Sequence, residues 1–289
     1  MRVLITRPAS DAPVWVAALQ RAGYDAQAIP LIDIAAAPDV QPIDQAWTQW
    51  SQWQAVMFVS APAVRYFFAR QPEAYAWRDV HTRCWATGPG TQKALLKAGV
   101  PPELIDCPND QGGQFDSEAL WQEVHARVAP GLPVLIVRGR DLGHQVLTLD
   151  ADADADADAD ANANANANAN ANANANANGF GRDWLAQQLQ GVQVPVHFVV
   201  AYQRQAPVWT EAQRSQAALA ATDGSVWCLS SSQAVAHLQL NLPALDWSRS
   251  RCIVTHARIG LAAQALGFGQ VLVARPVLAD VLASLESLA

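Results

Sequence analysis

The stretch Val134-Leu135-Ile136-Val137-Arg138-Gly139 decides the fold, because the chain contains a second version of it. The counterpart is Val3-Leu4-Ile5-Thr6-Arg7-Pro8, at the start of the sequence. Each is a short apolar run, rich in β-branched residues, that ends in an arginine and a turn residue. Buried parallel strands have this composition. The pattern therefore predicts two equivalent strands, each followed by a loop that begins at its arginine.

The correspondence continues in the same order along the chain, which indicates an internal repeat. A helix-like segment follows each strand, then a longer extended run, then two further strand-like segments. The spacings also agree once residues 141–178 are set aside as an insertion in the second copy. The sequence therefore predicts two copies of one α/β unit with parallel strands. The corresponding segments are residues 15–20, 26–34, 56–60 and 84–87 in the first copy, and residues 184–189, 194–202, 226–230 and 252–255 in the second.

The two extended runs predict where the chain crosses between domains. We interpret residues 24–34 as one strand interrupted by Pro30, and a proline inside a strand favours an edge or a connector. With residues 194–202 as the return crossing, one domain is discontinuous. The expected boundaries are residues 1–36 and 203–289 for domain 1, and residues 38–198 for domain 2.

Within domain 2 we expect several further elements. Residues 39–54 form a helical pattern whose Trp47, Trp50 and Trp53 share a packing face. A short strand is expected at residues 103–106. Residues 134–137 are expected to complete the sheet.

Composition excludes several classes of protein. The net charge of −7 comes mostly from the aspartates between Asp150 and Asp160. The sequence has no stripe of basic residues, so a nucleic-acid partner is not expected. No apolar run is long enough to span a membrane. The sequence enters a strand directly, without a secretory signal, so we expect a cytoplasmic protein. The four cysteines form no CxxC pair, which favours reduced core thiols and argues against a zinc site.

One segment has an unusual composition. Ala and Asp alternate over residues 151–160, and Ala and Asn alternate over residues 161–178. These residues are poor strand formers, and the segment offers no large apolar side chain to bury. We therefore predict a disordered low-complexity insert over residues 141–178 of domain 2.

The loops after the predicted strands are the candidate functional site. Ligands of open α/β sheets bind outside the carboxyl ends of the strands, and exposed N–H groups at helix N-termini bind anions. Any one of these loops could simply carry a helix cap. Together, in two matching sets, they favour an anion-binding cleft. The loops are Thr6-Arg7, Ser60-Ala61, Thr87–Thr91, Arg138-Gly139, Ser230–Ser232 and Thr255–Ile259.

Other catalytic patterns do not emerge from the sequence. Gly88-Pro89-Gly90 has neither the dinucleotide nor the Walker spacing, and no catalytic triad or metal cluster is recognisable. His256 could be a general acid or a loop bystander. Tyr202 ends a crossing strand, where it could face the cleft or pack as a hinge aromatic.

These loops, in this order, resemble the uroporphyrinogen-III synthase family. The resemblance rests on Val3–Pro8, Phe58–Val64, Thr87–Thr91, Gly181–Leu185 and Val200–Arg204, together with Thr255–Ile259 and Leu266–Phe268. It implies two Rossmann-like or flavodoxin-like domains joined by a two-stranded connector, with the active site between them. It also implies a monomeric lyase without a cofactor that cyclises hydroxymethylbilane, a linear tetrapyrrole with eight carboxylates, by losing water and inverting the last ring.

The resemblance also implies the roles of individual residues. A tyrosine matching Tyr202 is the catalytic candidate that assists departure of the hydroxyl group. The loops hold carboxylates, largely through backbone N–H groups. The implied substrate-binding residues are Arg7, Ser60, Ala61, Thr87, Gly88, Thr91, Arg138, Gly139, Ser230, Ser231, Thr255, His256 and Ile259. The alternative is a bilobal small-anion binding or sensor protein without turnover. An enzyme that works by holding one folded geometry needs neither a strong nucleophile nor a metal.

Overall fold

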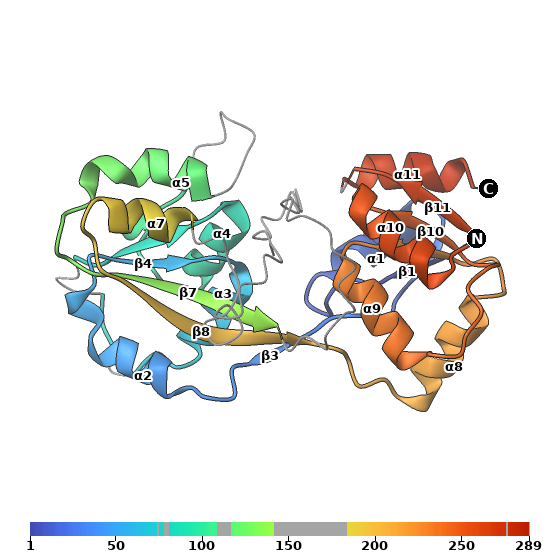
Figure 1. The fold of residues 1–289 in the computed structure, drawn as a ribbon, viewed down its shortest axis with the longest axis horizontal. Coiled ribbons are helices and arrows are strands. Elements are labelled where there is room, and N and C mark those ends of the chain that lie inside the picture. The colour runs from blue at the N-terminus through green and yellow to red at the C-terminus, as the bar shows by residue number, and fades with distance from the viewer. Residues whose placement is uncertain (74, 78–80, 109–116, 142–183, 276, 289) are drawn as a thin grey trace. The chain divides into compact units, whose positions relative to one another are not determined.

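The computed structural model describes residues 1–73, 75–77, 81–108, 117–141, 184–275 and 277–288 (Figure 1). These residues form two compact units, of which unit 1 contains the described residues of 1–34 and 205–288, and unit 2 contains those of 35–141 and 184–204. Apart from Asp141, the insert predicted at residues 141–178 lies outside the described residues.

Unit 1 is built on a five-stranded parallel sheet with the order β11-β10-β9-β1-β2. Adjacent residues of a strand pack into different hydrophobic clusters, one on each face of the sheet, because side chains alternate between the two faces. Leu4 packs in a cluster with helices α8, α9 and α10, whereas Val3 and Ile5 pack in another with α1 and α11. The strands are β1 (Arg2–Ile5), β2 (Asp25–Ala28), β9 (Val226–Leu229), β10 (Arg251–Val254) and β11 (Gln270–Val273), and the helices are α1 (Ala12–Arg21), α8 (Glu211–Ala220), α9 (Ser232–Asn241), α10 (Ala257–Leu266) and α11 (Leu278–Glu286).

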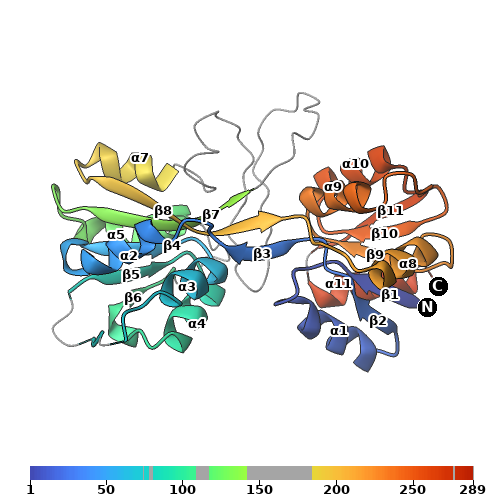
Figure 2. The ribbon, with the colours of Figure 1, turned by 90° about the horizontal axis from the view of Figure 1, so that it is seen from below.

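Unit 2 is built on a six-stranded sheet with the order β3-β8-β7-β4-β5-β6, parallel from β8 to β6. The chain leaves unit 1 along β3 and returns along the neighbouring β8 (Figure 2). The strands are β3 (Asp33–Ala36), β4 (Ala55–Phe58), β5 (Arg83–Ala86), β6 (Ile105–Asp106), β7 (Val134–Asp141) and β8 (Val196–Gln205). The helices are α2 (Gln41–Thr48), α3 (Ala61–Phe68), α4 (Pro89–Lys97), α5 (Ser117–Val124) and α7 (Trp184–Gly191), with 3-10 turns at Trp50–Gln52, Pro102–Leu104 and His125–Arg127.

The two units share one strand order, which confirms the predicted α/β class. The order β2-β1-β9-β10-β11 in unit 1 matches β8-β7-β4-β5-β6 in unit 2. Val3 of β1 pairs with Val226 of β9, and Val134 of β7 pairs with Ala55 of β4. Within this shared order of five strands, each unit therefore takes two strands from one sequence copy and three from the other, and unit 2 adds β3.

Two of the expected strands differ from the structure. Residues 24–34 are not one strand, because β2 ends at Ala28 and β3 begins at Asp33. Between them, the N–H groups of Ile29 and Leu31 donate to the carbonyls of Ile5 and Thr6, while Pro30 has no N–H to continue a ladder. The strand expected at residues 103–106 is only β6, since Pro102 opens a 3-10 turn.

The strand predicted at residues 134–137 does not lie at the edge of the sheet. It continues to Asp141 as β7, because β8 pairs along its whole length, and β3 lies beyond β8. The helix expected at residues 39–54 is interrupted at Gln49, which leaves α2 and a 3-10 turn. Its three tryptophans are buried, as predicted, and Trp47 stacks on Trp50 with ring centroids 4.6 Å apart.

Candidate functional site

The carboxyl edge of the sheet in unit 1 gathers candidate residues from three neighbouring strands. Arg7 follows β1, Ser230 follows β9 and Thr255 follows β10. All three line one small pocket, whose wall also includes Trp15 and Cys228. The strand order therefore brings together residues that are far apart in the sequence.

Arg7 is a charged residue of this pocket, yet it is buried, with only 8% of its surface exposed. Its guanidinium lies over the Trp15 ring, 4.4 Å from the centroid, a contact that compensates part of the cost of burying a cation. Burial raises the pKa of the nearby Cys228 thiol to about 12, and the charge of Arg7 opposes that rise. The thiol is therefore neutral at physiological pH.

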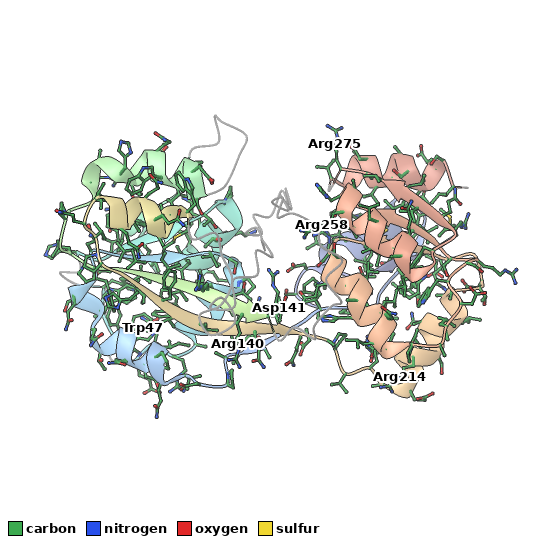
Figure 3. All side chains as sticks on the ribbon, in the orientation of Figure 1. Trp47, Arg140, Asp141, Arg214, Arg258 and Arg275 are labelled. Carbon is green, nitrogen blue, oxygen red and sulfur yellow. The ribbon has the colours of Figure 1, made fainter. Side chains whose placement is uncertain are left out.

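Two helices of unit 1 begin at this edge, each with a cap supplied by its loop. The Ser231 hydroxyl accepts from the Gln233 N–H at the start of α9, at 3.2 Å. Nδ1 of His256 accepts from the Arg258 N–H at the start of α10, at 3.1 Å. Figure 3 shows the Arg258 side chain projecting from this first turn. His256 is thus a helix cap in the structure.

Ile259 contributes no polar group to the edge. Its side chain is 1% exposed and belongs to the hydrophobic core. Its N–H donates to the His256 carbonyl at 3.1 Å. By contrast, the Thr255 hydroxyl oxygen is buried and has no hydrogen-bond partner among the described residues.

In unit 2 the corresponding strands β4 and β5 lead into α3 and α4. Ser60 caps α3, whose first residue is Ala61, by accepting from the Ala63 N–H at 3.3 Å. Gly88 is the N-cap of α4 and has no side chain to occupy that position. The Thr87 hydroxyl donates to the Val59 carbonyl at 3.2 Å. Both helices therefore present their N-termini at one edge of the sheet.

Thr91 lies inside α4 and is fully buried. Its hydroxyl has no partner within the described part of the chain. Thr91 and Thr255 therefore both have a buried hydroxyl without a hydrogen-bond partner among the described residues. Buried hydroxyls are normally paired, which sets these two apart.

Arg138 and Gly139 are not in a loop, which corrects the interpretation drawn from the sequence. Both lie within β7, because the partner strand β8 extends pairing as far as Asp141. The Arg138 guanidinium is 4.1 Å from the centroid of the Phe198 ring, and the residue is 4% exposed. The strand continues through Arg140, whose Nη2 donates to the side chain of Gln203 at 3.2 Å (Figure 3).

Tyr202 lies beside Gly139 on β8 and is 3% exposed. Its hydroxyl accepts a hydrogen bond from the Ser60 hydroxyl at 3.1 Å. Its ring stacks with Tyr66 of α3 at a centroid distance of 6.4 Å. The structure thus brings Ser60, Gly139 and Tyr202 together within unit 2.

Three aromatic residues that contact the candidate side chains of the two units were not predicted from the sequence. Trp15, Tyr66 and Phe198 contact Arg7, Tyr202 and Arg138, respectively. None of them belongs to a recognisable motif.

Both edges carry groups whose chemistry suits anions. Helix N-termini carry partial positive charge and unpaired N–H groups, and Arg7 adds a full charge in unit 1. Within the described ranges, no group of His, Cys, Asp and Glu side chains is arranged to hold a metal ion. None of the helices in these ranges has the length and apolarity of a membrane span.

Comparisons with known proteins agree with this geometry. The family model described as uroporphyrinogen-III synthase HemD matches residues 13–148, which include parts of both units. The uroporphyrinogen-III synthetase from Helicobacter pylori 26695 has a similar fold, with a TM-score of 0.53 and 15% identity over 100% of both chains.

Residues 13–148 of this chain thus resemble the uroporphyrinogen-III synthase family. A mutant uroporphyrinogen III synthase from the thermophilic bacterium Thermus thermophilus also matches, with 12% identity and a TM-score of 0.49 over 100% of this chain and 98% of that one. No curated protein sequence matches significantly. The family consists of lyase-type cyclases of haem biosynthesis.

Proposed function

We propose that this protein is a uroporphyrinogen-III synthase, which cyclises hydroxymethylbilane to uroporphyrinogen III with inversion of the terminal pyrrole ring and loss of water. The observation that carries the proposal is the buried Tyr202 hydroxyl, which accepts from Ser60 beside helix N-termini suited to carboxylates. The family match supports the same activity.

In this proposal Tyr202 acts as the general acid. The bond between the terminal methylene carbon and its oxygen breaks, the electron pair leaves with the oxygen, and the phenol proton completes a water molecule. The methylene carbon then bonds to the α-carbon of the terminal pyrrole that already carries a bridge. The bond from that α-carbon to its bridge breaks, and the bridge carbon bonds instead to the free α-carbon of the same ring, which loses one proton. That proton balances the one given by Tyr202, so the net change is the loss of water.

The remaining proposed residues bind carboxylates. In unit 1 these are Arg7, Ser230, Ser231, Thr255 and His256, and in unit 2 they are Ser60, Ala61, Thr87, Gly88, Thr91, Arg138 and Gly139, of which Ser60 and Gly139 contribute through backbone groups and not through a side chain. Ile259 contributes only through the helix turn that it stabilises, since its N–H is used by His256. Tyr202 is almost fully buried, so productive binding requires that the groups covering it move.

We also propose that the enzyme acts in the cytoplasm, as a monomer and without nucleic acid. The four cysteines are all free, which agrees with a reducing compartment.

A single assay tests the proposed activity. Freshly generated hydroxymethylbilane is incubated with the protein, and the products are oxidised and separated as type I and type III porphyrins. The substrate closes spontaneously to the type I isomer, so an excess of type III over a protein-free control is the expected result. Binding of the substrate with only type I product would contradict an enzyme and favour a binding protein.

A further inference from the structure

An extra residue in β8 decides which face of the sheet Tyr202 occupies. Arg138 pairs with Val200, but Gly139 pairs with Tyr202, so the register shifts at this point and Ala201 is left over. Regular alternation would place Tyr202 on the same face as Val200 and Phe198. The bulge instead places Tyr202 on the face of the sheet that carries Val137 and Val199. Bulges near active sites commonly redirect a side chain in this way.

Gly139 provides the space that the Tyr202 ring occupies. A Cβ built on Gly139 would lie 2.8 Å from Cε1 of the ring and nearer still to Cζ and Cε2. Side chains do not tolerate such distances, so any other residue would displace the ring. Gly139 needs no unusual φ angle, which leaves this close approach as the reason for a glycine.

Ser60 fixes the hydroxyl end of the same ring. Its oxygen accepts from the Ala63 N–H, so its proton is directed to the Tyr202 oxygen. Ser60 is fully buried, which limits it to this geometry. The phenol proton then points away from Ser60 and is available for transfer, and the Ser60 donor remains to stabilise the phenolate that transfer leaves behind.

The described part of unit 1 has no equivalent arrangement. By the repeat and the strand registers, Gly139 corresponds to Pro8, Tyr202 to Ile32 and Ser60 to Ser230. Only the serine is shared, and in unit 1 it lies in the pocket with Arg7. The combination of glycine, bulge and tyrosine is therefore specific to unit 2, which argues against a general feature of the fold.

We propose that Ser60 and Gly139 are positioning residues for Tyr202, with Ser60 stabilising the phenolate and Gly139, with the bulge at Ala201, placing the ring. This inference rests on the proposed function for its kinetic consequences. The placement of the ring can be tested without turnover, so the positioning proposal and the proposed function can fail separately.

The kinetic test is a double-mutant cycle. Ser60→Ala should lower kcat about 10- to 100-fold, the range for one hydrogen bond to a charged group, with KM changed by less than about threefold. In a Tyr202→Phe background the same change should have almost no further effect, because its partner is gone. Ser60→Thr, which keeps the hydroxyl, should recover most of kcat. An equal loss in both backgrounds would overturn the proposal.

Ser60 also caps α3, so a matched control separates capping from positioning. Thr210 caps α8 by accepting from the Gln213 N–H, and within the described residues its hydroxyl is hydrogen-bonded only to Gln213. Thr210→Ala should lower the thermal midpoint about as much as Ser60→Ala and leave kcat unchanged. A similar kcat loss in both variants would show that only stability is involved.

The structural test uses protein labelled with 3-fluorotyrosine and ¹⁹F NMR, with Tyr202→Phe assigning the Tyr202 resonance. Both Ser60→Ala and Gly139→Ala should move that resonance in substrate-free protein, whereas Gly191→Ala, where an added Cβ meets nothing within 4 Å, should not. Unmoved resonances would overturn the proposal. If Gly139→Ala does not fold, Ser60→Ala still decides. A moved resonance in a protein without turnover would refute only the proposed function.

Discussion

At the residue scale, the Tyr202 hydroxyl can be removed without removing the ring that fills the space over Gly139. Tyr202→Phe should lower kcat about 10²- to 10⁴-fold, the usual contribution of a general acid. The thermal midpoint should change little, because one hydrogen bond contributes only about 1 kcal/mol to the free energy of unfolding. Initial rates and thermal denaturation measure both. Unchanged turnover would remove Tyr202 from the acid role.

The cysteines offer a second test at this scale. Burial raises the pKa of Cys107 to about 11 and that of Cys252 to about 12, and it also raises the pKa of Cys84. Because thiolate is the reactive form, native protein at pH 7.5 should react slowly with Ellman's reagent, first at the partly exposed Cys107. The rate should rise with pH until the pH approaches about 11. Rapid reaction of all four thiols in native protein at pH 7.5 would contradict the buried placement.

At the element scale, the candidate site depends on strands that end beside helix N-termini. Helices α3, α9 and α10 each begin at a residue whose side chain caps one N–H group. The other first-turn N–H groups keep the positive end of the helix dipole. Because β9 and β10 are neighbours, as are β4 and β5, the helix N-termini occur in pairs.

These elements predict that substrate affinity falls with salt. A polyanion bound by helix dipoles and arginines is attracted electrostatically, and added ions screen that attraction. The dissociation constant should rise between low and high ionic strength, and Arg7→Gln should both weaken binding and flatten the dependence. Arg275→Gln is the control, since Arg275 is a highly exposed arginine paired with Asp280 of α11. An affinity that does not change with salt would contradict a carboxylate site.

The element scale is also where sequence reasoning was least accurate. Arg138 and Gly139 read as a loop because a glycine follows a charged residue at the end of an apolar run. They remain in β7 because β8 continues to pair with it, and a partner strand cannot be recognised from the residues of β7 alone. The bulge at Ala201 is equally invisible, since it is a mismatch between two strands and not a property of either.

At the scale of the whole molecule, the composition of residues 151–178 predicts that their deletion is tolerated. Ala, Asp and Asn supply no large apolar side chain to a core. Shortening a flexible loop changes its closure cost by only about 0.6 kcal/mol per halving, against about 5–15 kcal/mol of stability for a domain. The thermal midpoint and cyclisation rate should be nearly unchanged. A midpoint lower by more than about ten degrees, or loss of cyclisation, would show that the segment is structural.

The sequence by itself determined the repeat and the α/β class, because apolar periodicity and strand-end residues are local properties of the chain. It also located Arg7, Ser60, Thr87, Ser230 and Thr255 at strand ends. Only the tertiary structure decided which strands become neighbours. Each sheet combines strands from both sequence copies, such as β1 with β9 and β7 with β4. Pairing between distant segments depends on the complete fold, and so does the contact of Ser60 with Tyr202, 142 residues apart.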